Sequence, residues 1–439
     1  MALLTPFTAL LVSLCLPMVI AAQNIQSPVS VTPPVQHLTL DKAEEIAIQH
    51  HPQLKQARFT AAAAGELPTQ LRAAYYPMVT GNFTGVEADP GSRITAGALN
   101  NPIIYDRYAN GLELNQLVTD FGRTHNLVAS AHLQAEAAQA AVEVTREDVL
   151  LGVDSAYFGV LRSLAVLKVA EQTTNERQVV VNQVTALTNN RLKSGLDLSF
   201  AQVNLSQAQL LLTSAQNDVE SSYADLAMAL GYSDHQSFDL ADETAANLGL
   251  PTVDEAVAKA LANRPELAQQ QYNVEAAKRF VTAERDLYFP RLEILGVAGL
   301  TPYRQDQLLD RYAAAGFNLE VPIFEGHLFG ARRAEANFRA QSQDQQLQVL
   351  KDSLVRDVRH AWLNANTVRQ NLDLTAQLVA QADKALNLAQ ERYKLGLSSI
   401  VELSEAQLND AQAQIQAVTA KYNYRAAIAQ LQYQEGNLK

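Results

Sequence analysis

Two glutamates, Glu402 and Glu405, are the side chains with the clearest chemical signal in the sequence. They follow the stretch YKLGLSS (393–399), in which Gly396 interrupts a long helical pattern. Their spacing of three residues places both carboxylates on one helix face. Such a face attracts cations where it lines a passage, but most charges on helices are solvated surface groups. Spacing alone leaves both interpretations open.

The composition excludes several classes of function. A formal net charge of -12 and the lack of a Lys/Arg cluster speak against nucleic acid as a partner. Cys15 is the only cysteine, so the chain has no disulfide framework or thiolate metal site. His50 and His51 are adjacent, and neighbouring residues on a helix point about 100° apart, which does not suit a metal site. We expect no enzyme active site, no cofactor and no metal.

The first residues are typical of an export signal. An apolar run from about residue 10 to residue 22 ends in small residues, although no Lys or Arg precedes it. We expect a signal peptide over 1–22 and an N-terminal extension over 23–37. No later segment is an uninterrupted apolar run of about 18 residues, so we expect no membrane-spanning helix.

The rest of the chain is a tandem repeat. Matching segments lie 213 residues apart near the start of each copy and 205 residues apart further on. The matches are LTLDKAEEIAIQHHPQL (38–54) with PTVDEAVAKALANRPEL (251–267), YYP (75–77) with YFP (288–290), AQVN (201–204) with AQLN (406–409), and Gly231 with Gly436. We therefore predict repeats over 38–232 and 251–439, joined by a linker over 233–250.

Each repeat has the same predicted order of elements. A helix (39–76; 252–289) ends before a proline, and two alternating strand segments follow (78–86 and 108–118; 291–299 and 312–321). A very long helix (124–190; 328–392) then ends at a glycine turn, and a shorter helix returns (197–231; 400–435). At 1.5 Å per residue the long helices reach roughly 100 Å. A 3-4 spacing of apolar residues from Val358 to Tyr393 predicts a coiled-coil seam.

Four strands of this length can cross a bilayer, but four strands cannot close a barrel. Open strand edges are not tolerated in lipid. The chain must therefore assemble, and the pattern fits two copies with eight strands or three copies with 12.

The repeated order of elements resembles that of the TolC-type outer membrane efflux protein family. The resemblance is carried by YYP and YFP, the strand-to-helix junctions DFGR (120–123) and FEG (324–326), and the turns RLKSGL and RYKLGL, and it covers about residues 38–436. It implies a mostly α chain with a small transmembrane β part. A homotrimer would complete a 12-strand β-barrel in outer membrane lipid and a long α-helical barrel in the periplasm. It also implies an exit duct that serves an inner-membrane pump through a periplasmic adaptor protein.

The same resemblance implies roles for residues at the periplasmic tip. It places Glu402 and Glu405 at the gate constriction and makes Tyr393 a residue that bonds to the neighbouring coil. Ser398 stands where the family has a basic residue, so the contact of that residue is expected to be either absent or rebuilt with Arg392. Asp197 follows Gly195 by two residues, yet the offset of 205 residues places it opposite Glu402, as if the first turn had shifted by 4 residues, or about one helical turn. Asp197 is therefore also assigned to the gate.

Two Gly-Leu pairs, Gly195/Leu196 and Gly396/Leu397, match the family positions that dock the adaptor; a plain helix-ending turn would explain the glycines but not the leucines. An alternative function is a soluble periplasmic coiled-coil scaffold. A scaffold would explain the long helices and the charge, but not four alternating segments in duplicate. The sequence does not identify the cargo, the adaptor or the pump class.

Overall fold

The computed structural model describes residues 37–89, 91–93, 103–234, 238–242, 249–304, 306 and 308–438. The expected signal peptide and residues 23–36 of the expected N-terminal extension lie outside these ranges. The described chain forms a single compact unit over His37–Lys439.

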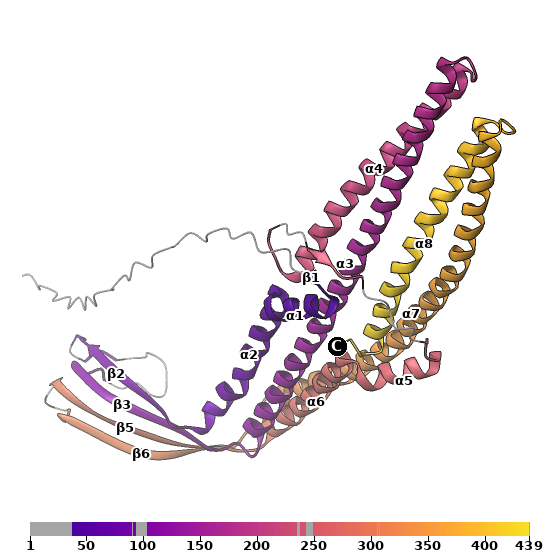
Figure 1. Cartoon of the computed structure of the whole chain (residues 1–439). Coiled ribbons are helices and arrows are strands. Elements are labelled where there is room, and N and C mark those ends of the chain that lie inside the picture. Colours follow the sequence, from indigo (N-terminus) through magenta and orange to yellow (C-terminus); the bar gives the residue numbers. More distant parts are fainter. Residues whose placement is uncertain are drawn as a thin grey trace, which may run out of the picture. The chain divides into compact units, whose positions relative to one another are not determined.

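Both repeats contain the same succession of helices and strands (Figure 1). In the first copy these are α1 (Leu40–His50), α2 (Pro52–Arg72), the 3-10 turn η1 (Ala73–Tyr75), β2 (Met78–Val86), β3 (Arg107–Thr119), α3 (Arg123–Asn189) and α4 (Gly195–Leu230). In the second they are α5 (Val253–Asn263), α6 (Pro265–Arg285), η2 (Asp286–Tyr288), β5 (Arg291–Arg304), β6 (Arg311–Glu320), α7 (Leu328–Lys394) and α8 (Ile400–Gln434). Two short strands, β1 (His37–Leu38) and β4 (Asp239–Leu240), pair in parallel.

The first helix of each repeat is interrupted and begins again at its internal proline, one of the two outcomes, a kink or a restart, that the prolines at 52 and 265 predicted. Pro52 and Pro265 each occupy the first turn of a new helix, where the missing N–H breaks no helical hydrogen bond. The residues before them, His51 and Arg264, are extended, as a following proline favours. The His51 ring also accepts a hydrogen bond from the N–H of Gln53 (3.3 Å), so this histidine caps α2.

The four long strands form one antiparallel sheet in the order β2-β3-β5-β6. Its register places alternate residues of every strand on the same face. One face is more polar and the other is mainly apolar. The more polar face carries Thr80, Asn82, Glu113, Asn115, Glu293, Asn318 and Glu320 together with Met78, Leu295 and Val297, and the mainly apolar face carries Val79, Phe83, Leu112, Leu114, Ile294, Leu300, Phe317 and Leu319 together with Asn110 and Gln116.

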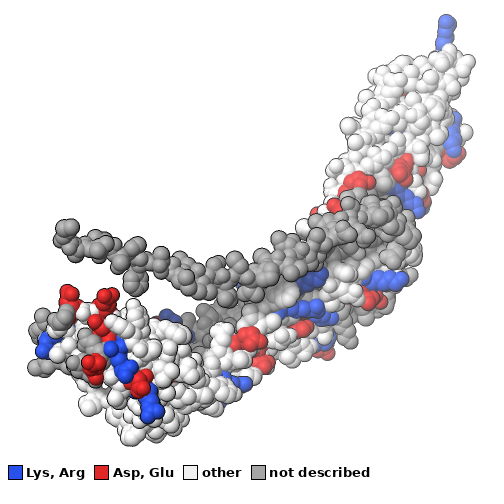
Figure 2. Space-filling model, turned by 90° about the vertical axis from the view of Figure 1, so that its left-hand side faces the viewer, with Lys and Arg blue, Asp and Glu red and all other residues white. Residues whose placement is uncertain are grey.

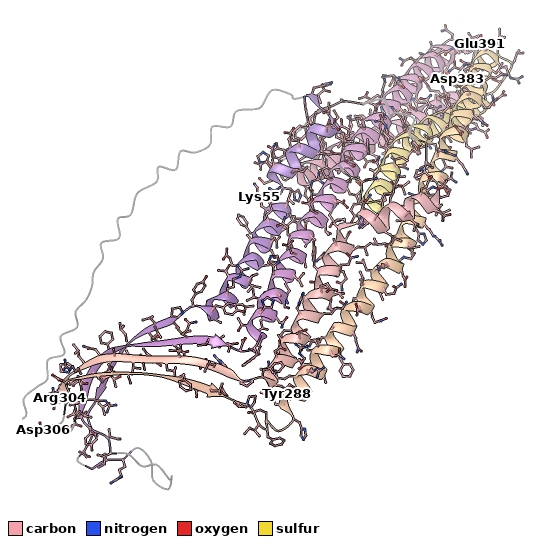
Figure 3. All side chains as sticks on the ribbon, turned by 90° about the horizontal axis from the view of Figure 1, so that it is seen from below. Lys55, Tyr288, Arg304, Asp306, Asp383 and Glu391 are labelled. Carbon is pink, nitrogen blue, oxygen red and sulfur yellow. The ribbon has the colours of Figure 1, made fainter. Side chains whose placement is uncertain are left out.

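Charged side chains gather at the end of the sheet that is remote from the helices (Figure 2). At this end Arg304 is the last residue of β5, Arg311 is the first of β6, and Asp306 and Asp310 lie in the connection between them. Figure 3 shows Arg304 and Asp306 at this end and Tyr288 at the opposite end, where the helices begin. The sheet is therefore apolar on one face with ionic groups beyond its far end.

The helices pack in two sets along the long helices α3 and α7, which have 67 residues each. Next to the sheet, contacts run in the order α2, α3, α6, α7. Toward the other end they run α4, α3, α8, α7. The predicted seam of α7 is confirmed, because Val358, Ala361, Ala365, Leu386 and Tyr393 are all buried.

One long helix also has an apolar stretch. Within the described residues, α3 alone has the length and average composition of a membrane-spanning helix, and half of that stretch is buried inside the chain. The sequence expectation of no spanning helix rested on uninterrupted apolar runs, which α3 lacks. The burial indicates a core helix that packs on its neighbours along most of its length.

The N-terminus and the inter-repeat linker meet at the middle of α3. The hydroxyl of Tyr157, a fully buried residue of α3, lies 2.9 Å from the carbonyl oxygen of Leu38 and 2.7 Å from that of Ala241. In the linker, Asp242 accepts a hydrogen bond from Lys421 of α8 at 2.7 Å. These contacts hold β1 and β4 against both repeats.

A buried carboxyl pair lies beside this junction. Asp154 of α3 is only 4% exposed and hydrogen-bonds with Glu44 of α1. Burial, followed by the nearby Glu44 carboxylate, raises the pKa of Asp154 from 3.8 to about 8. Burial likewise raises the pKa of Glu44. At neutral pH the pair therefore holds a proton that the unfolded chain would release.

This proton makes the stability of the chain dependent on pH. Between about pH 4 and pH 8 the native state binds more protons at Asp154 than the unfolded state does, so stability falls as pH rises through this range. Asp154→Asn cannot ionise, so we expect its thermal midpoint to change little at pH 5 and to exceed that of wild type at pH 9. Thermal scans at both pH values, with exposed Asp225→Asn as control, measure this. Parallel pH curves for wild type and Asp154→Asn would contradict it.

Candidate functional site: the hairpin tips

The turn of the second repeat requires its glycine. Gly396 follows the end of α7 with φ of 72°, a left-handed conformation that L residues rarely adopt. The N–H of Leu397 donates to the carbonyl of Arg392 at 2.8 Å and closes the turn. Ser399 then caps α8 by accepting from the N–H of Glu402 at 3.3 Å.

The turn of the first repeat has the same geometry but a different residue at its centre. Arg191 takes the left-handed conformation with φ of 62°, and the N–H of Leu192 donates to the carbonyl of Leu187 at 2.9 Å. Ser194 caps α4 in a reciprocal box with Asp197, whose carboxylate accepts from the Ser194 N–H at 3.0 Å. Gly195 is the first residue of α4, beyond the turn.

The two turns therefore align at the 205-residue offset. Arg191 corresponds to Gly396, Leu192 to Leu397, and Ser194 to Ser399. The sequence analysis matched the two glycines to each other and so inferred a shift of the first turn by about one helical turn. That inference is wrong, because capping and left-handed positions coincide without a shift. The sequence analysis also missed Leu192. Its side chain is 70% exposed, which is similar to Leu196 and Leu397 at 66% each.

Tyr393 brings the two tips together. It is 4% exposed, and its ring lies 4.5 Å from the Lys193 ammonium of the other turn, a cation–π contact between the repeats. Burial, followed by the charge of Asp197, raises the pKa of the Tyr393 hydroxyl. The surrounding apolar cluster draws Val184 and Ala201 from repeat 1 and Leu386, Ala389, Ile400 and Leu403 from repeat 2.

The two glutamates lie on the exposed side of α8 just after this cluster. Arg392 pairs with Glu402 across the turn at 3.0 Å. Glu405 is exposed one helical turn later. The Glu402 side chain keeps 46% exposure, so its carboxylate remains accessible to ions while it is paired.

Two polar ties between the repeats were not predicted. Arg177 of α3 donates a hydrogen bond to Gln407 of α8, with both side chains buried, and Asn204 of α4 donates to Ser404 of α8 at 2.6 Å. Burial lowers the pKa of Arg177. Asn204 and Gln407 belong to the motifs AQVN and AQLN. The sequence analysis used these motifs only to determine the offset between the repeats. Nothing in either motif indicates which residue faces the other repeat.

No group of three or more His, Cys, Asp or Glu side chains among the described residues is arranged to hold a metal ion. The contacts of the tip are instead a packed aromatic seam, two helix caps and one ion pair. Such an arrangement can hold hairpins together or release them, and the exposed carboxylates can act on passing ions.

A comparison with known protein families identifies this architecture. The sequence model for outer membrane efflux proteins matches residues 45–232 and 256–436, which are most of the two repeats. The chain belongs to the outer membrane efflux protein family. The resemblance seen in the sequence is therefore confirmed, and so are the outer membrane location and the efflux class of function.

Relatives and solved structures agree with this family. The efflux protein is 23% identical over 360 residues to the outer membrane efflux protein BepC of Brucella suis, covering 80% of this chain and 75% of BepC. It is 21% identical over 329 residues to the outer membrane protein TolC of Escherichia coli, covering 71% of this chain and 66% of TolC. The CmeC outer membrane channel of Campylobacter jejuni superimposes with a TM-score of 0.79 at 18% identity, covering 91% of this chain and 85% of CmeC. The efflux protein thus has the fold of these channels, mostly α with a small sheet.

The alignment of the two turns predicts different effects of alanine substitution at Gly396 and at Gly195. A Cβ at Gly396 meets no atom within 4 Å, so only its positive φ opposes substitution, whereas Gly195 is helical with open space around it. We expect Gly396→Ala to destabilise the tip by about 1 kcal/mol and Gly195→Ala to be neutral or slightly stabilising. Limited proteolysis at the tips and thermal midpoints measure both. Equal effects of the two substitutions would contradict the alignment of the turns.

Proposed function

We propose that this protein is the trimeric exit duct of an efflux or secretion system rather than an enzyme. One observation carries the proposal: a four-stranded sheet with one polar and one apolar face ends in two unpaired edge strands, β2 and β6. Three copies joined edge to edge would supply 12 strands, with the polar face toward a lumen and the apolar face toward lipid. The helices α2, α3, α6 and α7 would continue the same ring into the periplasm.

The remaining functional assignments rest on the family and on the tip geometry. Glu402 and Glu405 would line the periplasmic constriction as rings of three carboxylates, with Arg392 as the partner of Glu402. Tyr393, packed between the turns beside Asp197, would hold the gate shut. The exposed leucines next to Gly195 and Gly396 would dock a periplasmic adaptor that links the duct to an inner-membrane pump. Small molecules are the proposed cargo.

Two measurements test the duct itself. Fractionation should recover heat-modifiable oligomers from the outer membrane, and the purified protein should form channels in planar bilayers. Recovery in the periplasmic wash would instead favour the soluble scaffold.

The gate assignment predicts a change in ion selectivity. Glu402→Gln combined with Glu405→Gln should lower cation selectivity and weaken block by multivalent cations applied from the periplasmic side by several-fold, because the rings lose their charge. Planar bilayer recordings measure both quantities. Glu391→Gln is the matched control, since Glu391 is an exposed tip residue on α7 that pairs with Lys394. Unchanged block in the double variant would remove these glutamates from the constriction.

The docking assignment predicts a loss of transport without a loss of assembly. A variant with glutamate in place of Leu192, Leu196 and Leu397 should lose the efflux-dependent resistance of the host, because the substitutions make an apolar docking surface charged. Leu210→Glu is the control, since this leucine is 72% exposed and lies on α4 about 21 Å from Leu196. Full resistance with all three leucines replaced would refute docking at the tips.

A further inference from the structure

A pocket of about 630 Å³ lies where α2, α3 and α6 approach the sheet. Arg72 of α2, His125 and His132 of α3, and Arg279 of α6 are among its lining residues, although the surface that the pocket presents is mainly apolar. Tyr75, Val128 and Leu133 contribute to an apolar floor. The pocket is thus a mainly apolar hollow that two arginines and two histidines border.

This pocket opens on the side of the helices that continues the apolar face of the sheet. The opposite side holds a separate hollow lined by Arg123, Thr124 and Leu127 of α3 together with polar-face residues such as Asn115, Glu293 and Glu320. At 100° per residue, the two sets of α3 residues point in roughly opposite directions. The Gln116 side chain, on the apolar face of β3, donates to the carbonyl of Tyr75 at 2.9 Å and joins that face to the pocket wall.

The depth of the pocket matches a headgroup layer. With the sheet across the hydrocarbon core, α3 begins at the membrane boundary, and His125 lies about 3 Å and His132 about 14 Å along it. Arg72 ends α2 one 3-10 turn before β2. Its guanidinium therefore lies close to the level of the phosphates in the leaflet that faces the helices.

The two arginines are not neutralised by the chain. Within the described ranges, neither Arg72 nor Arg279 forms an ion pair, although the chain as a whole has a net charge of -12. One carboxylate, Glu136, approaches the His132 ring at 3.8 Å. Most of the lining comes from α3 and α6, which lie inside the helix order, whereas Arg72 and Tyr75 lie at the end of that order, just before the edge strand β2.

We propose that this pocket binds the phosphate headgroup of an anionic phospholipid from the leaflet that faces the helices. Guanidinium groups bind phosphate oxygens with charge-assisted hydrogen bonds, and a basic pocket beside a membrane-spanning element suits an anionic headgroup. The floor formed by Val128 and Leu133 fits the glycerol and the first methylene groups. This inference rests on the proposed placement of the sheet in the outer membrane.

Native mass spectrometry of the detergent-extracted protein tests the site. Dioleoylphosphatidylglycerol and zwitterionic dioleoylphosphatidylcholine are titrated separately, with and without excess inorganic phosphate. We expect wild type to retain the anionic lipid preferentially and Arg72→Gln with Arg279→Gln to lower its affinity roughly tenfold or more, since each cation near a membrane surface contributes about 1 kcal/mol.

The control is Arg58→Gln with Arg359→Gln. Arg58 is an exposed residue of α2 about 21 Å from Arg72 on nearly the same face, and Arg359 is exposed on α7. This control should keep wild-type lipid retention. No preference of the wild type for the anionic lipid, or equal retention by both double variants, would overturn the site. Displacement of the lipid by inorganic phosphate would overturn the lipid assignment in favour of a free-anion site.

The cell fraction that contains the wild-type protein distinguishes a failure of the lipid site from a failure of the proposed duct. Wild type recovered as oligomers from the outer membrane, but without lipid preference, contradicts only the lipid site. Wild type recovered from the periplasmic wash contradicts the duct and, with it, the site.

Discussion

The unpaired edges of the four-stranded sheet constrain everything else in this protein. Strands β2 and β6 each leave a row of backbone N–H and C=O groups without a partner within the described chain. In lipid such groups cannot be left open, and four strands are too few to close on themselves. Edge-to-edge assembly of several copies, as proposed above, would satisfy these groups and direct the apolar face outward and the polar face inward. The helices α2, α3, α6 and α7, which continue from the strands, would then form a ring as well.

The helices extend far beyond the sheet, and each long helix is packed against other helices along its length. Each long helix of 67 residues is accompanied first by one helix pair and then by a returning helix. The helix pair in each repeat is divided at Pro52 or Pro265, where a new helix begins. Buried polar contacts, such as Asp154 with Glu44 at the middle and Arg177 with Gln407 near the tips, join different elements and cost desolvation that apolar residues would not. The contact of Arg177 with Gln407 joins the two repeats, whereas that of Asp154 with Glu44 joins two helices of the first repeat.

Most of the fold could be predicted from the sequence, because repetition and hydrophobic period are strong signals over long elements. The boundaries of β2 were predicted to the residue, and those of α3 and α7 to within two. Repetition failed at the first tip, since Gly195 resembles a turn residue while the left-handed position belongs to Arg191. Only the hydrogen bonds of the caps distinguish the two. The ties of Arg177 and Asn204 could not be predicted either, because a single chain's pattern does not indicate which helices of different repeats become neighbours.

The central claim is that the sheet edges are closed by further copies of the same chain. The mass of the particle extracted from the outer membrane in mild detergent, measured by native mass spectrometry with lipid and detergent removed in the gas phase, tests it most directly. The account predicts a particle of three chains, which pairs every edge β2 with a neighbouring β6. A monomer that is stable and inserted in the membrane would leave both edges open and would contradict the account.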